Sequence, residues 1–216
     1  MDNLVPCSGC NEMAVTEWDE YTCSAAAGGG HLNVLQWARA NGCDWDDYTC
    51  TSAAGGGFLS VLQWARANGC QWNSQTCSRA AGSGHLSVLQ WARSHECEWG
   101  SDTCWRAAEG GHLSILQWAR ANGFAWDCYT CSAAAGSGHL SILQWVRLNG
   151  FQWNRDTCST VARGGHLSAL QWARAHGCEW DSSSACSAAA RAGISPSSNG
   201  RERIDVTGTE IPLKQF

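Results

Sequence analysis

Lysine and proline are almost missing from this chain of 216 residues, which holds one lysine, Lys214, and three prolines. Tryptophan and cysteine are each present fourteen times, and glycine twenty-four times. Bias of this kind indicates that one short segment has been copied many times. The basic residues are too few to balance the acidic ones, so the formal net charge is −5. A dedicated nucleic-acid binder should carry a basic stripe, and we therefore expect no nucleic acid among the partners.

Signals for membranes and secretion are also missing. No apolar run approaches the length of a membrane span, and the start, Met1 to Pro6, has no basic region followed by an apolar one. There is no Asn-x-Ser/Thr acceptor for glycosylation. We expect no membrane contact and a cytoplasmic or nuclear protein, where cysteines stay reduced.

Three residue columns recur every 27 residues. One column is the Trp of a Gln-Trp pair: Trp37, Trp64, Trp91, Trp118, Trp145 and Trp172. A second Trp column comprises Trp18, Trp45, Trp72, Trp99, Trp126, Trp153 and Trp180. A cysteine column comprises Cys23, Cys50, Cys77, Cys104, Cys131 and Cys158, and only the seventh copy slips by one residue, to Cys186. We number the six complete repeats 1 to 6 by these first six cysteines.

Each repeat is predicted to form two helices. Asp, Asn or Gly follows the second-column Trp and would cap a first helix, at positions 19, 46, 73, 100, 127, 154 and 181. On that helix, Cys23, Ala26 and Ala27 form one stripe of small residues, and a glycine cluster ends it. The second helix, from about Leu32 to Asn41, has a broad apolar arc that needs packing on two sides, and Gly42 supplies the left-handed residue that ends it.

Helices this short and rich in glycine persist only when repeats stack on one another. The predicted fold is therefore all-α: a helix-turn-helix repeat solenoid over residues 19–193, with six full units and one terminal helix. Residues 1–18 would be a degenerate N-terminal cap or a flexible start, and residues 194–216 a flexible C-terminal tail.

The segment from Ala26 to Cys43, A-A-G-G-G-H-L-N-V-L-Q-W-A-R-A-N-G-C, resembles the second half of the ankyrin repeat, A-A-x-x-G-H-x-x-V-V-x-L-L-L-x-x-G-A. The repeat is six residues shorter than the usual 33, and the gap falls between Trp45 and Thr49, where the ankyrin β-hairpin finger would be. The resemblance implies helix pairs with little or no β structure. Leucine-rich repeats are the rival fold of similar period, but their pattern needs Asn where this chain has Ala40.

The cysteines are interpreted as core residues. In the column that begins at Cys43, the residues Cys70, Cys97 and Cys178 share their position with Phe124 and Phe151. A site that accepts Phe needs an apolar filler, so we expect all fourteen cysteines to be free thiols. Cys7 and Cys10 form a C-x-x-C pair, but the sequence offers no second pair. A metal-responsive role for these two cysteines is the weakest of three functional hypotheses.

Other constellations give no catalytic signature. The His column, His31, His85, His112, His139 and His166, has Phe58 in repeat 2 and is therefore interpreted as structural. No triad, carboxylate pair or phosphate loop stands apart from the repeat. We expect no enzyme activity, no cofactor and no metal.

An arginine column and a variable helix face remain as candidate binding surfaces. The column, Arg39, Arg66, Arg93, Arg120, Arg147 and Arg174, could bind phosphate or an acidic ligand. The alternative is that each Arg spans to loop carboxylates such as Asp44 or covers a Trp ring.

On the first helix, the positions −2, +1, +2 and +5 from the Cys should point outward, at 100° per residue. They vary between copies, and Trp105 is the one Trp outside the repeat. Trp105 could either anchor a partner or simply lie flat on its neighbours. The main prediction is a monomeric, non-enzymatic scaffold that binds an unknown protein partner through Trp105, Arg106, Arg79, Glu109, Tyr48, Tyr129 and Asp102; nucleic-acid or acidic-ligand binding through the Arg column is the alternative.

Overall fold

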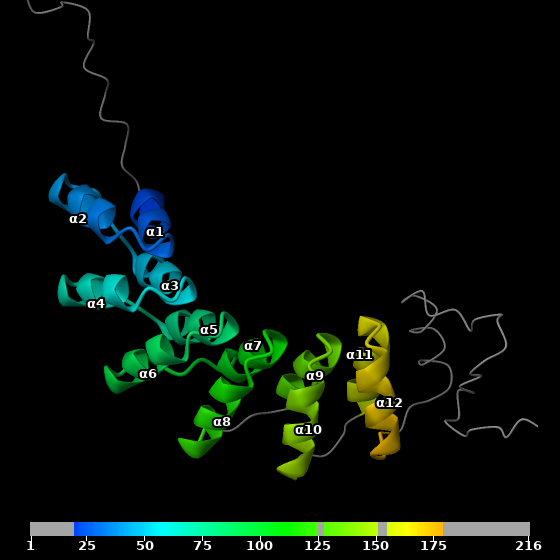
Figure 1. Cartoon of the computed structure of the whole chain (residues 1–216). Helices are drawn as coiled ribbons and strands as arrows, with labels where there is room; N and C mark the ends of the chain where they lie inside the picture. The colour runs from blue at the N-terminus through cyan, green and yellow to red at the C-terminus, as the bar shows by residue number, and fades with distance from the viewer. Residues whose placement is uncertain (1–19, 125–127, 151–154, 179–216) are drawn as a thin grey trace, which may run out of the picture. The chain divides into compact units, whose positions relative to one another are not determined.

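The computed structural model describes residues 20–124, 128–150 and 155–178. Within these ranges it contains twelve α-helices and no strand, arranged as six helix pairs (Figure 1). The first helices are α1 (Glu20–Gly28), α3 (Asp47–Gly55), α5 (Ser74–Gly82), α7 (Thr103–Glu109), α9 (Cys128–Gly136) and α11 (Arg155–Gly164). The second helices are α2 (Leu32–Ala40), α4 (Leu59–Ala67), α6 (Leu86–Ser94), α8 (Leu113–Ala121), α10 (Leu140–Leu148) and α12 (Leu167–Ala175). The prediction of an all-α helical-repeat solenoid is confirmed.

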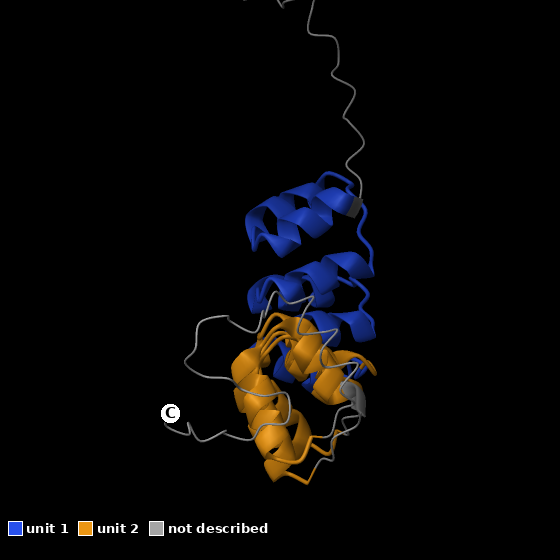
Figure 2. Ribbon diagram, turned by 90° about the vertical axis from the view of Figure 1, so that its right-hand side faces the viewer, with its two compact units in different colours: residues 1–80, 87–99 blue, residues 81–86, 100–216 orange. Residues whose placement is uncertain are grey.

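The chain divides into two compact units (Figure 2). The first comprises residues 1–80 and 87–99, and the second residues 81–86 and 100–216. In the first unit α1 packs beside α3, and each pairs with its own second helix. In the second unit α7, α9 and α11 pack side by side in the same manner. The predicted N-terminal cap, terminal helix and C-terminal tail lie outside the described residues, so the domain boundaries stay predictions.

Small residues on the first helices and branched residues on the second form the core. The stripe of Cys and two Ala, the first of which is Val161 in repeat 6, is buried in every described repeat, as the helical spacing predicts. On the second helices the buried positions are aliphatic, such as Val88, Leu89 and Ala92 in α6. The Trp of the Gln-Trp pair is less buried than its size suggests: Trp37 is 53% exposed, and the other five are half-buried. The core is therefore an aliphatic and small-residue layer with tryptophans at its edge.

We call the segment between each second helix and the next first helix a connector. Two connectors end in a residue whose side chain caps the following helix. Asp46 accepts a hydrogen bond from the backbone N–H of Tyr48 at 3.0 Å, and Asn73 accepts one from Gln75 at 2.8 Å. Gly100, which has no side chain, cannot do this, and α7 begins only at Thr103, preceded by Asp102. The prediction of Gly100 as a helix cap is wrong, because a cap of this kind needs a side-chain oxygen.

The second helices end as predicted, in a left-handed residue. The backbone angle φ is +86° at Gly42 and +87° at Gly69, and it is +66° at Glu96, which is the one described non-glycine residue with positive φ. The preceding column, Asn in four repeats and His95 or His176 in two, donates a side-chain N–H to the Trp carbonyl one turn earlier; for Asn68 this distance is 2.8 Å. Asn and His are exchangeable here because both present a donor nitrogen.

Replacing Glu96 by glycine should raise the free energy of unfolding by about 1 kcal/mol, because a Cβ is disfavoured at a left-handed position. The reciprocal change Gly69→Glu, in the same unit, should lower it by a similar amount, since no atom lies within 4 Å of a Cβ at position 69 and only the backbone conformation is affected. Urea unfolding midpoints would check both. Equal midpoints for wild type and Glu96→Gly would contradict the strain.

Candidate functional sites

Two sets of residues stand out from the packing: buried cysteine pairs inside the repeats, and a variable row of side chains on the first helices. In repeats 1, 2, 3 and 6, the first-helix cysteine meets the connector cysteine 20 residues later in the chain. The Cys23 and Cys43 sulfurs are 3.1 Å apart, and the Cys50 Sγ is 3.9 Å from the Cys70 carbonyl oxygen. Cys158 and Cys178 are joined in a disulfide with a Cα–Cα distance of 6.2 Å.

This disulfide overturns part of the prediction about cysteine. Eight described cysteines are free and buried, as expected, but Cys158 and Cys178 are not free thiols. The tolerance of Phe at positions 124 and 151 correctly indicated a buried position. It could not exclude a partner, because the pairing depends on two columns that meet only in the folded repeat.

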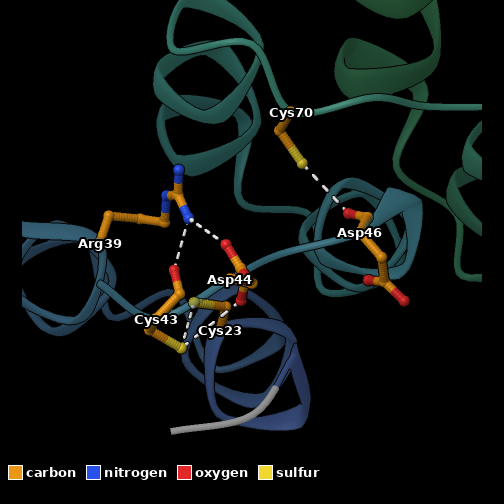
Figure 3. Close-up of polar contacts among 6 residues, drawn as sticks. All are labelled: Cys23, Arg39, Cys43, Asp44, Asp46 and Cys70. Atoms are coloured by element: carbon orange, nitrogen blue, oxygen red, sulfur yellow. Dashed lines mark hydrogen bonds and ion pairs between the residues drawn. The ribbon is translucent and has the colours of Figure 1, made fainter. Parts of the chain in front are cut away.

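Two connector cysteines also contact the residue that caps the first helix of their own repeat. The Cys70 thiol donates to the Asp46 carbonyl oxygen at 3.2 Å (Figure 3). The Cys97 thiol contacts the equivalent Asn73 oxygen at 3.4 Å. The hydrogen bond from the Cys50 thiol lowers the pKa of Cys70, and the nearby Arg66 acts in the same direction. The pKa of Cys50 is raised, by this hydrogen bond and by burial. In repeat 2 the connector sulfur therefore ionises more readily than the first-helix sulfur.

The arginine column is engaged within the repeat. Arg39 donates from Nη1 to the Cys43 carbonyl oxygen at 2.5 Å, lies 3.6 Å from the exposed Asp44 carboxylate, and covers the Trp45 ring at 4.2 Å from its centroid (Figure 3). Arg66 makes the same contacts with the Cys70 oxygen and Trp72, and Arg93 donates to the Cys97 oxygen. The interpretation that these arginines serve the connector carboxylates and tryptophans is confirmed for Arg39. The guanidinium groups of Arg39, Arg66 and Arg93 therefore bind their own connectors and do not form a row that is open to phosphates.

The histidine column joins successive repeats. His112, His139 and His166 each place Nε2 2.8–3.0 Å from a carbonyl oxygen at the end of the preceding first helix, Gly82, Glu109 and Gly136 respectively. The structural interpretation of this column is confirmed. In the described ranges, no group of three or more His, Cys, Asp or Glu side chains could hold a metal ion. Cys7 and Cys10 lie outside those ranges.

A shallow hollow of about 530 Å³ lies beside α1, lined by Tyr21, Thr22, Ala25, Ala26, His31 and Val34. Val34 is 49% exposed there, whereas the equivalent Val61 is buried by the preceding repeat. The hollow is the packing surface that a preceding repeat covers elsewhere, so it is not a separate site.

The exposed row on the first helices differs in one position from the prediction. Position +1 was expected to face outward, but Thr51 and Ser78 are buried there, and the Thr51 hydroxyl is 3.3 Å from that of Thr76 on the next first helix. Trp105 occupies the same position and is half-buried. No described residue at positions −2, +2 and +5 is buried, and within the first unit the Cβ of Arg79 lies over Gly55 of the preceding repeat.

The predicted partner-binding residues fall into two groups. Asp102, Trp105 and Arg106 come together on α7: Arg106 Nε is 2.7 Å from the Asp102 carboxylate, and its guanidinium lies 4.8 Å from the Trp105 ring centroid. Glu109 is exposed on the same helix, and Tyr129 on the adjacent α9. Tyr48 and Arg79 are exposed on α3 and α5 of the first unit. Nothing tests these residues as a binding site.

The fold and these contacts define a helical-repeat protein whose repeats are joined through histidines and backbone carbonyls, with thiol contacts inside each repeat. No family model and no curated protein matches the sequence. Among solved structures, the chain is similar to the pentatricopeptide repeat protein PPR10 in complex with an 18-nucleotide psaJ RNA element, and to a triple cysteine-to-serine variant of the same complex. Each match has a TM-score of 0.46 and 15% identity, and covers 77% of this chain but 30% of that one.

These comparisons correct three predictions. The matched proteins are pentatricopeptide repeat proteins, so the assignment to the ankyrin family is not supported. Both matched structures are complexes with RNA, and neither the protein-binding scaffold nor the absence of nucleic acid among the partners is retained as a prediction. The helical-repeat solenoid stands. No helix in the described residues is long and apolar enough to span a membrane.

Proposed function

We propose that this chain is a non-catalytic binder of single-stranded nucleic acid, which it contacts through the exposed face of the first helices. The proposal is carried by one observation. All three tyrosines of the chain, Tyr21, Tyr48 and Tyr129, occupy position −2 of a first helix and are 72%, 56% and 69% exposed. Exposed aromatic rings on a regular support are platforms on which unpaired bases stack.

Arginines occupy the repeats that lack tyrosine. Tyr stands at position −2 in repeats 1, 2 and 5, where position +2 is the small Ala25, Ser52 or Ala133. In repeats 3, 4 and 6, position +2 or +5 supplies Arg79, Arg106 or Arg163 instead. Arg79 and Arg163 are exposed. Small neighbours leave the tyrosine faces open, and Arg79 and Arg163 supply cations for phosphates, whereas Arg106 is paired with Asp102.

The formal charge of the repeats is less negative than that of the whole chain. Over the predicted solenoid, residues 19–193, eleven arginines stand against thirteen carboxylates, which is −2 of the total formal charge of −5. The exclusion of nucleic acid rested on the charge of the whole chain, more than half of which comes from residues outside the predicted solenoid.

Single strands fit this face better than a duplex does. Bases in a duplex already stack on each other and cannot cover a tyrosine ring, whereas duplex affinity depends mostly on phosphate contacts. With about two arginines engaged, the logarithm of the affinity should fall with the logarithm of salt with a slope of about −1.4. We therefore expect a shallow salt dependence and a clear preference for single strands.

Fluorescence anisotropy with labelled oligouridine, oligothymidine and a duplex would test the proposal. Changing Tyr129 to Ala should weaken single-strand binding about 5- to 150-fold, because stacking contributes roughly 1–3 kcal/mol per base. Tyr129→Phe should retain most of the affinity, since the ring face remains.

Gln75→Ala is the matched control, at the same exposed position of repeat 3, and should change little. Absence of single-strand binding at low salt would contradict the proposal, as would full affinity in a variant with all three tyrosines changed to Ala. Comparing oligouridine with oligothymidine shows whether RNA or DNA is preferred.

A further inference from the structure

We propose that the cysteine pairs Cys23–Cys43, Cys50–Cys70 and Cys77–Cys97 are oxidation sites, which a peroxide converts to the same intra-repeat disulfide that joins Cys158 to Cys178. This inference is independent of nucleic-acid binding. It assigns a chemical modification to residues whose positions the repeat makes equivalent.

The backbone holds all four connector cysteines alike. The N–H of each connector cysteine donates to an alanine carbonyl oxygen of its second helix at the same distance, 3.0 Å, for Cys43, Cys70, Cys97 and Cys178. The closed pair has a Cα–Cα distance of 6.2 Å, within the usual range for disulfides. In repeat 1 the two sulfurs already lie 3.1 Å apart. Closing the other pairs therefore needs side-chain rotation rather than a new backbone arrangement.

Two of the pairs also have an identifiable first nucleophile. The connector cysteine is the better one in repeats 2 and 3, because a thiol hydrogen bond lowers the pKa of Cys70 and of Cys97, and the thiolate is the reactive form. Its sulfur attacks one peroxide oxygen, the O–O bond breaks, and sulfenic acid and one water form after protonation. The first-helix sulfur then attacks the sulfenic sulfur, the S–O bond breaks, and a second water leaves with the thiol proton.

The reaction balances in atoms and electrons with the peroxide as the only oxidant. Two protein thiols lose two electrons and two protons, and hydrogen peroxide gains both to give two waters. Because the paired sulfurs are buried, the reagent must be small and must enter as the connector opens locally. The connector offers such an opening, since Gly42 and Asp44 flank Cys43 and are both exposed.

Repeat 4 supplies an internal control. Phe124 takes the place of the connector cysteine, its N–H makes the same 3.0 Å hydrogen bond, to Ala119, and its ring packs on Trp118 with the centroids 6.1 Å apart. Cys104 is therefore buried without a connector thiol in its own repeat. It should stay reduced while the paired cysteines oxidise.

The test is peroxide treatment of the fully reduced, native full-length chain, followed by alkylation of the remaining thiols, tryptic digestion and mass spectrometry. We expect linkages between cysteines 20 residues apart in repeats 1, 2, 3 and 6, with Cys104 alkylated. The melting temperature should rise by about 5 °C or more for each pair closed, and dithiothreitol should reverse the rise.

Two reciprocal variants make the outcome decisive. Cys97→Phe should abolish the linkage in repeat 3 alone, and Phe124→Cys should create a new linkage from Cys104 to position 124. The proposal would be overturned by linkages that form only in denaturant, by pairing between repeats, or by two alkylated thiols in the Phe124→Cys variant. If one variant fails to fold, the linkage map of the wild-type chain still decides the matter.

Discussion

Replacing Leu116 by alanine is expected to lower the free energy of unfolding by about 2–5 kcal/mol. Leu116 lies in α8, which packs against α7, and its side chain is fully buried. Truncation removes three carbons from a layer that neighbouring small residues cannot refill, so the lost burial and the cavity both contribute. The adjacent Gln117→Ala is the matched control, because Gln117 is exposed on the same helix.

Urea unfolding also compares the stability lost in Leu116→Ala with that lost in Trp118→Ala. The place of Trp118 in a repeat column predicts that Trp118→Ala costs several kcal/mol, as for a core aromatic, whereas the place of Trp105 outside the columns predicts that Trp105→Ala costs almost nothing. Both tryptophans are half-buried, so we now expect each to cost less than Leu116→Ala. Urea unfolding of the four variants would check this order. A larger loss for Trp118→Ala than for Leu116→Ala would show that the aromatic edge, not the aliphatic layer, holds the repeats together.

Replacing Gly110 by alanine is expected to cost about 2–4 kcal/mol, through crowding between repeats. Gly110 has ordinary helical angles, with φ −77°, so its backbone does not require glycine. A Cβ there would lie 2.5 Å from the Gly82 carbonyl oxygen and 2.7 Å from the His112 ring. Something must move, and the movement also disturbs the hydrogen bond from His112 to Gly82. Overpacking and a lost hydrogen bond together give the expected size.

Gly123→Ala separates this effect from backbone strain. Gly123 has a φ of +78°, and no atom lies within 4 Å of a Cβ placed there. Alanine should therefore cost only about 1 kcal/mol, from the left-handed conformation. Thermal unfolding of the two variants would distinguish the mechanisms. Equal losses of stability in the two variants would mean that the preceding repeat has room for a Cβ at position 110.

Much of the fold could be read from single residues and their spacing. The 27-residue step located the helix pairs, and the column of Gly42 and Gly69 identified a left-handed position that Glu96 also adopts. Helical angles failed at position +1, where Thr51 is buried. A helical wheel describes an isolated helix, and it cannot show how much of that helix the next repeat covers.

The candidate sites were harder to predict, because they depend on contacts between columns. Neither Cys50 nor Cys70 signals a pair by itself, and the two meet only when the connector folds back onto the first helix. The tyrosine column was visible in the sequence, but the whole-chain charge led to the wrong partner class. Charge counted over a chain that includes long terminal segments does not describe the surface of its repeats.

Photochemical cross-linking of the full-length chain to oligouridine, with the modified residues located by tandem mass spectrometry, tests the proposed function most directly. The account predicts nucleotide adducts on Tyr21, Tyr48 and Tyr129, which are lost for each tyrosine that is changed to Ala. Adducts confined to the second helices, for example on Trp37, would contradict it, as would a chain that forms no adducts at low salt.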